Sequence, residues 1–112
     1  MDHNKILESL RILQKDTHKT AKDKGWFDKD KPFPECLALM HSELSEALEA
    51  YRHHSPKDEH CPEFGNLEIE LADCIIRIFD YAEYAGLDVP GAILAKNAYN
   101  KTRPYRHGNK KI

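Results

Sequence analysis

The chain has 112 residues, of which 40% are apolar and 32% charged, and its formal net charge is −2. This length suits one domain with one hydrophobic core, and the composition is typical of a soluble globular protein. The near-neutral charge argues against a strongly basic nucleic-acid-binding protein, and no 18-residue apolar run is present that would indicate a membrane span.

Residues 1–112 are therefore expected to form a single domain, in which residues 102–112 are a basic C-terminal tail. The first residues lack the apolar stretch and the cleavage site of a signal peptide, so we expect a cytoplasmic protein. The three cysteines, Cys36, Cys61 and Cys74, form no CxxC pair. This count argues against both a disulfide framework and a cysteine zinc site.

Apolar residues recur at helical spacing along the chain, and no segment alternates as a half-buried strand does. We expect an all-α fold, a four-helix arrangement with helices at about residues 2–23, 35–53, 65 or 66–84, and 88–101. Gly25 and Gly86 are expected to end the first and third helices. Asp88 is expected to cap the fourth helix, with Pro90 in its first turn.

Two acidic pairs at helical spacing, Glu43/Glu46 and Glu70/Asp73, interrupt helices that otherwise look buried. A helical wheel of the second helix places Glu43 and Glu46 beside the flank of an apolar face. That face consists of Leu37, Met40, Leu44, Leu48 and Tyr51. A carboxylate in such a setting needs a partner or a metal ion, whereas Glu49 is expected to face solvent.

The polar stripe of the third helix allows two interpretations. It can be a solvated face on which Arg77 bridges Asp73 and Asp80 at helical spacings. Alternatively, its acids can combine with those of the second helix, as facing side chains do in the metal sites of helical bundles. Oxygen ligands of this kind suit Mg²⁺, with Mn²⁺ as a possible substitute.

The segments His41–Ala50 and Glu68–Asp73 resemble the ExxE and ExxD motifs of the MazG-like, all-α nucleoside triphosphate pyrophosphohydrolases. The helix order and an aromatic loop before the first motif also fit, so the resemblance extends over roughly residues 20–105. It implies a dimer or a dimer of dimers, and hydrolysis of a (d)NTP to a monophosphate and pyrophosphate. Carried over by motif position, the metal ligands and catalytic residues are Glu43, Glu46, Glu70 and Asp73.

The chain departs from several relatives at Ser42, where they have another acid that is a candidate general base. A serine cannot act as this base at neutral pH without a base of its own, so activation of water falls to the metal or to a motif carboxylate. A catalytically inactive nucleotide-binding or regulatory protein of the same fold therefore stays an alternative. A third possibility is a small nucleic-acid-associated protein that uses the basic tail, although the near-neutral charge makes nucleic acid an unlikely partner.

Substrate-binding residues are expected on the fourth helix, where Lys96, Asn100 and Arg103 share one face. These residues can bind the outer phosphates of the substrate or simply form a solvated basic end of the helix. Arg77 is a further candidate for binding phosphate. Trp26 can stack on a nucleobase or close one end of the core, and for Phe33 we favour the core. Four short helices around a polar site leave little interior, so we expect another copy to cover apolar positions of the first and third helices.

Overall fold

A computed structural model describes all 112 residues and contains helices and turns without a sheet. The helices are α1 (His3–Asp23), α2 (Phe33–Arg52), α3 (Asn66–Ala85), α4 (Val89–Thr102) and α5 (Arg106–Asn109). The all-α class and the four long helices are confirmed. Two details differ, because α2 begins at Phe33 rather than near Glu35, and the short α5 was not predicted.

The predicted helix ends are found where local chemistry requires them. Gly25, just after α1, has a φ of +87°, and Gly86, which caps α3, has a φ of +73°. Residues other than glycine seldom adopt this left-handed backbone conformation. The carboxylate of Asp88 accepts a hydrogen bond from the Gly91 N–H at 3.1 Å, and Pro90 lies in the first turn of α4.

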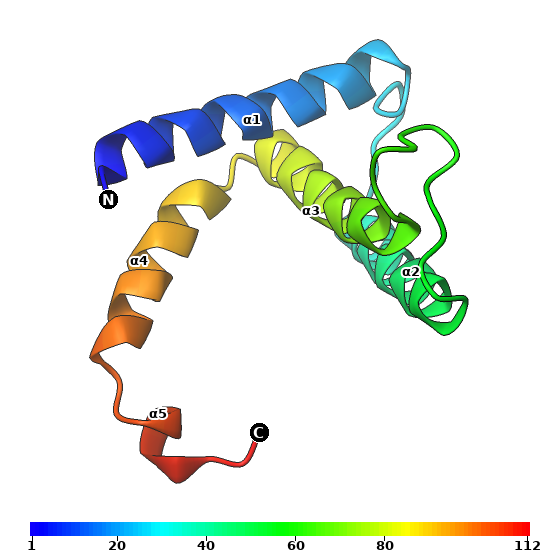
Figure 1. Cartoon of the computed structure of the whole chain (residues 1–112). Coiled ribbons are helices and arrows are strands. Elements are labelled where there is room, and N and C mark those ends of the chain that lie inside the picture. Colours follow the sequence, from blue (N-terminus) through cyan, green and yellow to red (C-terminus); the bar gives the residue numbers. More distant parts are fainter.

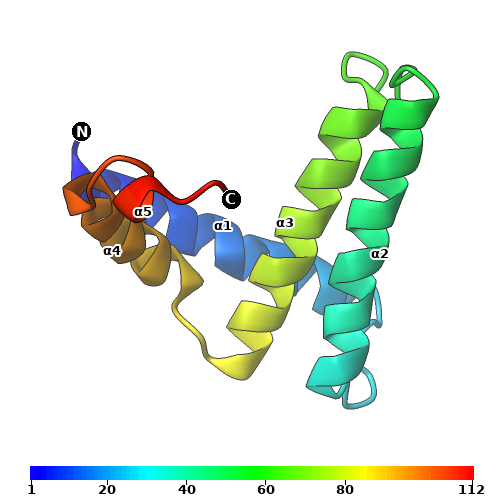
Figure 2. The ribbon, with the colours of Figure 1, turned by 90° about the horizontal axis from the view of Figure 1, so that it is seen from below.

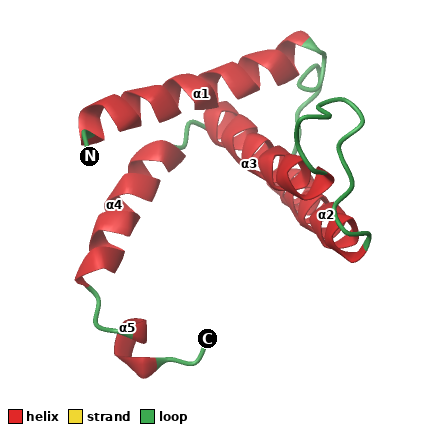
Figure 3. Cartoon of the chain, viewed as in Figure 1, coloured by secondary structure: helices red, strands yellow, loops and turns green.

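The helices form an open arrangement rather than a closed bundle. α2 and α3 lie side by side and antiparallel (Figure 2), and α1 crosses α3. α4 packs against α1 and then extends away from the α2–α3 pair towards α5 and the C-terminus (Figure 1). Figure 3 shows that loops and turns make all the connections between these helices.

Small side chains form the contact between α2 and α3. Cys36, Ala47 and Ala50 of α2 and Cys74 of α3 are all buried. We expected α2 to be buried through its apolar face, and this is wrong, since four of the five side chains of that face are exposed. The helix meets α3 through the neighbouring flank of small residues, because small side chains let two helix backbones approach closely.

α1 is attached to α3 by polar and aromatic contacts. His18 Nδ1 lies 2.8 Å from Asp80 Oδ1, and the His18 ring packs edge-on against Phe27 with 4.8 Å between ring centroids. The Phe27 ring also lies 4.6 Å from that of Tyr84. These contacts tie the loop after α1 to the last turns of α3.

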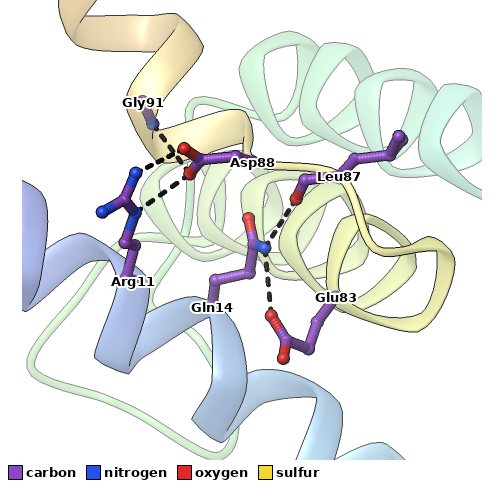
Figure 4. A network of polar contacts seen from close by, with 6 residues as sticks. All are labelled: Arg11, Gln14, Glu83, Leu87, Asp88 and Gly91. Atoms are coloured by element: carbon purple, nitrogen blue, oxygen red, sulfur yellow. Dashed lines mark hydrogen bonds and ion pairs between the residues drawn. The ribbon is translucent and has the colours of Figure 1, made fainter.

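A second polar group fixes the turn between α3 and α4 (Figure 4). The buried Gln14 donates through Nε2 to the Leu87 carbonyl at 2.9 Å and to Glu83 Oε1 at 3.2 Å. Arg11 Nε donates to Asp88 Oδ1 at 3.1 Å. Since Asp88 also caps α4, the direction of α4 is set by its contacts with α1.

Candidate metal centre

Three of the four predicted acidic ligands meet between α2 and α3. Glu43, Glu46 and Glu70 each offer a carboxylate oxygen, and these oxygens all lie within 4.8 Å of one another. Glu43 and Glu46 are three residues apart on α2, and Glu70 comes from the antiparallel α3. We call these three residues the acidic triad.

Glu43 is the most buried member of the acidic triad, with only 6% of its surface exposed. Its Oε1 accepts a hydrogen bond from Arg77 Nε at 2.7 Å, but its Oε2 is buried and has no hydrogen-bond partner. Glu70 Oε2 is likewise buried without a partner. Buried oxygens without donors are costly, and a bound cation would satisfy them.

The surroundings drive the pKa values of Glu43 and Glu70 apart. Burial raises the pKa of Glu70 to about 7, with further contributions from the neighbouring Glu46 and Glu43. Burial also acts to raise the pKa of Glu43, but the hydrogen bond from Arg77 and the interactions with Glu46 and Glu70 outweigh it and hold this pKa below its ordinary value. Near neutral pH Glu70 is therefore partly protonated, and a divalent cation bound there would displace this proton.

Asp73, the fourth predicted ligand, lies next to the acidic triad but is not part of it. Burial raises the pKa of Asp73, and the negative charge of Glu43 adds to this effect. The two groups are thus close enough to interact electrostatically. The role of Asp73 as a metal ligand stays a prediction.

The interpretation of the α3 polar stripe as a solvated face bridged by Arg77 is wrong. Arg77 pairs across the helix interface with Glu43, and Asp80 pairs with His18 of α1. The helical spacings suggested pairs within α3, whereas the neighbouring helices supply stronger partners because their carboxylate and imidazole groups are partly buried.

An open depression of about 530 Å³ adjoins the acidic triad. Glu46 and Glu70 line it, and so does Glu49, which we expected to face solvent away from the site. Glu49 also pairs with Arg52 at 3.3 Å. The depression therefore extends the acidic surface along α2 towards its C-terminal end.

Residues of the loop between α2 and α3 form the other wall of the depression, and none of them was predicted as a site residue. Lys57, Asp58 and His60 all line it. The loop is held by Asp58 Oδ2, which accepts hydrogen bonds from the N–H groups of His60 and Cys61 at 2.9 and 2.8 Å. The sequence did offer one indication that this loop lies near the site, because the loop connects the two helices that carry the acidic motifs.

The predicted substrate residues on α4 are not brought to the acidic triad within one chain. Lys96 Nζ and Arg103 Cζ lie 4.7 and 5.7 Å from the centroid of the Tyr99 ring, so both flank the same aromatic side chain. Asn100 is exposed on the same helix. Lys96 and Arg103 thus lie near each other, and phosphate binding stays a prediction.

The aromatic loop also lies apart from the acidic triad. Trp26 is 64% exposed and lines a different depression, together with Lys31, whose Nζ is 5.2 Å from the Trp26 ring. Phe33 is 46% exposed, and its ring centroid lies 5.0 Å from that of Tyr81. Phe33 thus closes the end of the core only in part. Phe27, which packs against His18 and Tyr84, covers more of it.

Comparisons with protein-family models, curated proteins and solved structures give no match to this chain. The resemblance to MazG-like enzymes therefore rests on the two acidic motifs and the order of the helices. None of the helices combines the length and the apolar character that crossing a bilayer requires.

Proposed function

We propose that this protein is a metal-dependent nucleoside triphosphate pyrophosphohydrolase, which converts a (d)NTP and water to the monophosphate and pyrophosphate. One observation carries the proposal. Two carboxylates from different helices, Glu43 and Glu70, each keep a buried oxygen without a hydrogen-bond partner, inside a cluster of three acids. Such oxygens destabilise the fold when they are unpaired, whereas a bound cation would be coordinated by them.

Glu43, Glu46 and Glu70 would hold Mg²⁺ or Mn²⁺, and Asp73, whose pKa responds to the charge of Glu43, is the remaining candidate ligand. Oxygen donors are those that these hard cations prefer. Bound there, the metal would neutralise phosphoryl oxygens and lower the pKa of a water molecule. Arg77 holds one oxygen of Glu43, and the other oxygen has no hydrogen-bond partner that would compete with a cation.

The depression beside the acidic triad supports a substrate larger than an ion. Its volume of about 530 Å³ falls in the range of small-molecule sites. Lys57, His53 and His60 also line it and offer donors to phosphate oxygens. The choice of the α–β bond comes from the resemblance to the MazG-like family.

Ser42 supports the alternative of a nucleotide-binding protein without turnover. Its hydroxyl donates to the Leu39 carbonyl at 2.6 Å, within its own helix. The side chain is therefore engaged with the backbone and has no carboxylate or imidazole partner that would make it a base.

An assay of a panel of NTPs and dNTPs with Mg²⁺, reporting pyrophosphate and phosphate separately, tests the proposal. We expect pyrophosphate release by the wild-type protein, no detectable release by Glu70→Gln, and unchanged release by Glu8→Gln, an exposed carboxylate on α1. Nucleotide binding without any release would support the alternative. Equal rates for Glu70→Gln and the wild-type protein would reject the acidic triad as the site.

A further inference from the structure

The charges of this chain are divided unequally between two parts of the structure. Residues 95–112, which include the basic tail expected at 102–112, carry six of the 17 Lys and Arg residues and none of the 19 Asp and Glu residues. We call residues 95–112 the basic arm. Its formal charge is +6, and that of residues 1–94 is −8. The near-neutral total, from which we expected nucleic acid to be an unlikely partner, is thus the sum of a strongly basic and a strongly acidic part.

The basic arm extends away from the α2–α3 pair (Figure 1), and the rest of the chain leaves it open to solvent. Every residue of the arm is exposed except Arg103, which is half-buried. Its six cationic residues are Lys96, Lys101, Arg103, Arg106, Lys110 and Lys111. None of them forms an ion pair, whereas four Lys and Arg residues elsewhere in the chain pair with a carboxylate. The positive charge of the arm is therefore free to bind an anionic partner.

Two exposed tyrosines lie between these cations. Tyr99 is 54% exposed, and Lys96 Nζ and Arg103 Cζ lie 4.7 and 5.7 Å from its ring centroid. Tyr105, which precedes Arg106 in the sequence, is 80% exposed, so little of its ring is covered. Aromatic rings interleaved with cations are typical of surfaces that bind single-stranded nucleic acid, because the rings stack on unpaired bases while the cations contact phosphates.

The apolar residues of α4 do not favour a membrane surface as the partner. A helix that lies on a bilayer gathers its apolar side chains on one face. Val89, Leu94 and Tyr99 follow one another at intervals of five residues, which is about 140° around the helix at each step, so they surround α4. A double helix is also a poorer partner, because its bases are stacked inside and cannot meet the tyrosine rings.

We propose that the basic arm binds single-stranded nucleic acid, with its cations on the phosphates and with Tyr99 and Tyr105 against unpaired bases. RNA and DNA both offer this chemistry, a chain of phosphodiesters that carries unpaired bases. The charge of −8 on residues 1–94 repels a strand from the rest of the protein and so directs it to the arm. This inference is independent of the proposed function, because the arm is separate from the acidic triad.

Fluorescence anisotropy of the wild-type protein with labelled oligo(dT) and oligo(U) tests the proposal. EDTA is present, so that no divalent ion bridges a strand to the acidic triad. We expect micromolar affinity for at least one strand at low salt, and a loss on the order of 100-fold between about 50 and 200 mM salt as counterions compete for the phosphates. A duplex of the same length should bind more weakly, and vesicles of anionic lipid should not bind.

Failure of both strands to bind, or binding that does not depend on salt, overturns the proposal. Equal or tighter binding of the duplex or of the vesicles overturns it as well, because the partner would then be a double helix or a membrane surface.

A matched pair of double variants locates the contact. Arg106→Gln with Lys110→Gln removes two cations from the arm, and Lys15→Gln with Lys22→Gln removes two exposed cations without ion pairs from α1. The arm variant should lower the affinity roughly tenfold and reduce the salt slope by about 1, while the α1 variant keeps both values. Equal effects of the two variants would mean that only the total charge matters, and the arm would be excluded as the site.

Tyr105 separates stacking on bases from attraction by charge alone. Tyr105→Ala should lower the affinity for the strand roughly tenfold, whereas Tyr105→Phe, which keeps the ring, should bind as the wild-type protein does. The position is exposed, so neither change disturbs the core. The same affinity for Tyr105→Ala and Tyr105→Phe would contradict stacking, and with it the assignment of the arm to single strands.

Discussion

Arg77 of α3 donates to Glu43 of α2 over 2.7 Å, and this contact joins the two acidic motifs across the helix interface. It neutralises one oxygen of a nearly buried carboxylate and leaves the second oxygen without a partner. The pair thus combines a structural link between the helices with an open ligand position.

Replacing Arg77 with Met should destabilise the metal-free protein by about 1 to 3 kcal/mol, because Glu43 then stays buried without its hydrogen-bond donor. Adding Glu43→Gln to this variant should recover part of the loss, since the unpaired charge is removed. Urea unfolding of the wild-type protein and both variants without divalent ions checks this. Unchanged stability of Arg77→Met would show that the contact is not formed in solution.

The stability of the metal-free protein should decrease as pH rises from about 4.5 to about 7. Glu70 has a pKa of about 7 in the fold and an ordinary value of 4.5, so in this window the folded state keeps a proton that the unfolded state has lost. Folding is then favoured at the acidic end, and the effect levels off above pH 7. In Glu70→Gln this component is absent, so its melting temperature should exceed that of the wild-type protein more at pH 8 than at pH 5. A difference independent of pH would contradict the raised pKa.

Mg²⁺ or Mn²⁺ should raise the melting temperature of the wild-type protein, and more so at pH 8 than at pH 6. The reason is that Glu70 must release its proton before it can bind a cation. Glu43→Gln should lose most of this effect, while Glu8→Gln should keep it. Calorimetric titration with each metal gives the affinities directly. The same affinity for Glu43→Gln and the wild-type protein would exclude Glu43 as a ligand.

Removing a cation from α4 tests the predicted phosphate contacts. If Lys96 or Arg103 binds an outer phosphate, each change to Gln should lower kcat/KM by roughly ten- to a hundredfold, which corresponds to about 1.5 to 3 kcal/mol. Lys101→Gln, also on α4, is the control for the loss of one positive charge. Equal small effects of all three changes would mean that these cations attract the substrate only through their overall positive charge and do not contact its phosphates.

The sequence was sufficient to predict the helices, because their ends depend on local residues. Gly25, Gly86 and Asp88 each mark an end through their own backbone or side-chain preference. The short α5 lacked such a signal, and it contains left-handed conformations at His107 and Gly108 that no helical pattern indicates.

The orientation of each helix was harder to predict. The wheel of α2 identified a broad apolar face, but it could not show whether that face meets α3 or lies open. The structure places the narrower row of Cys36, Glu43, Ala47 and Ala50 against α3. Their spacing of seven, four and three residues was the available signal for this contact.

The candidate site was predicted in part for the same reason. Spacing predicted Glu43, Glu46, Glu70 and Asp73 as potential ligands, and the structure brings the first three together. It could not show that Arg77 pairs with Glu43 or that the loop with Lys57 and His60 lines the adjoining depression, because both depend on how α2 and α3 pack.

Hydrolysis of a nucleoside triphosphate in ¹⁸O-labelled water with Mg²⁺ tests the central proposal most directly. Attack at the α-phosphorus would place the label in the nucleoside monophosphate, with unlabelled pyrophosphate as the second product, and Glu43→Gln would form neither. Label in orthophosphate, with a nucleoside diphosphate as the second product, would contradict the proposed reaction.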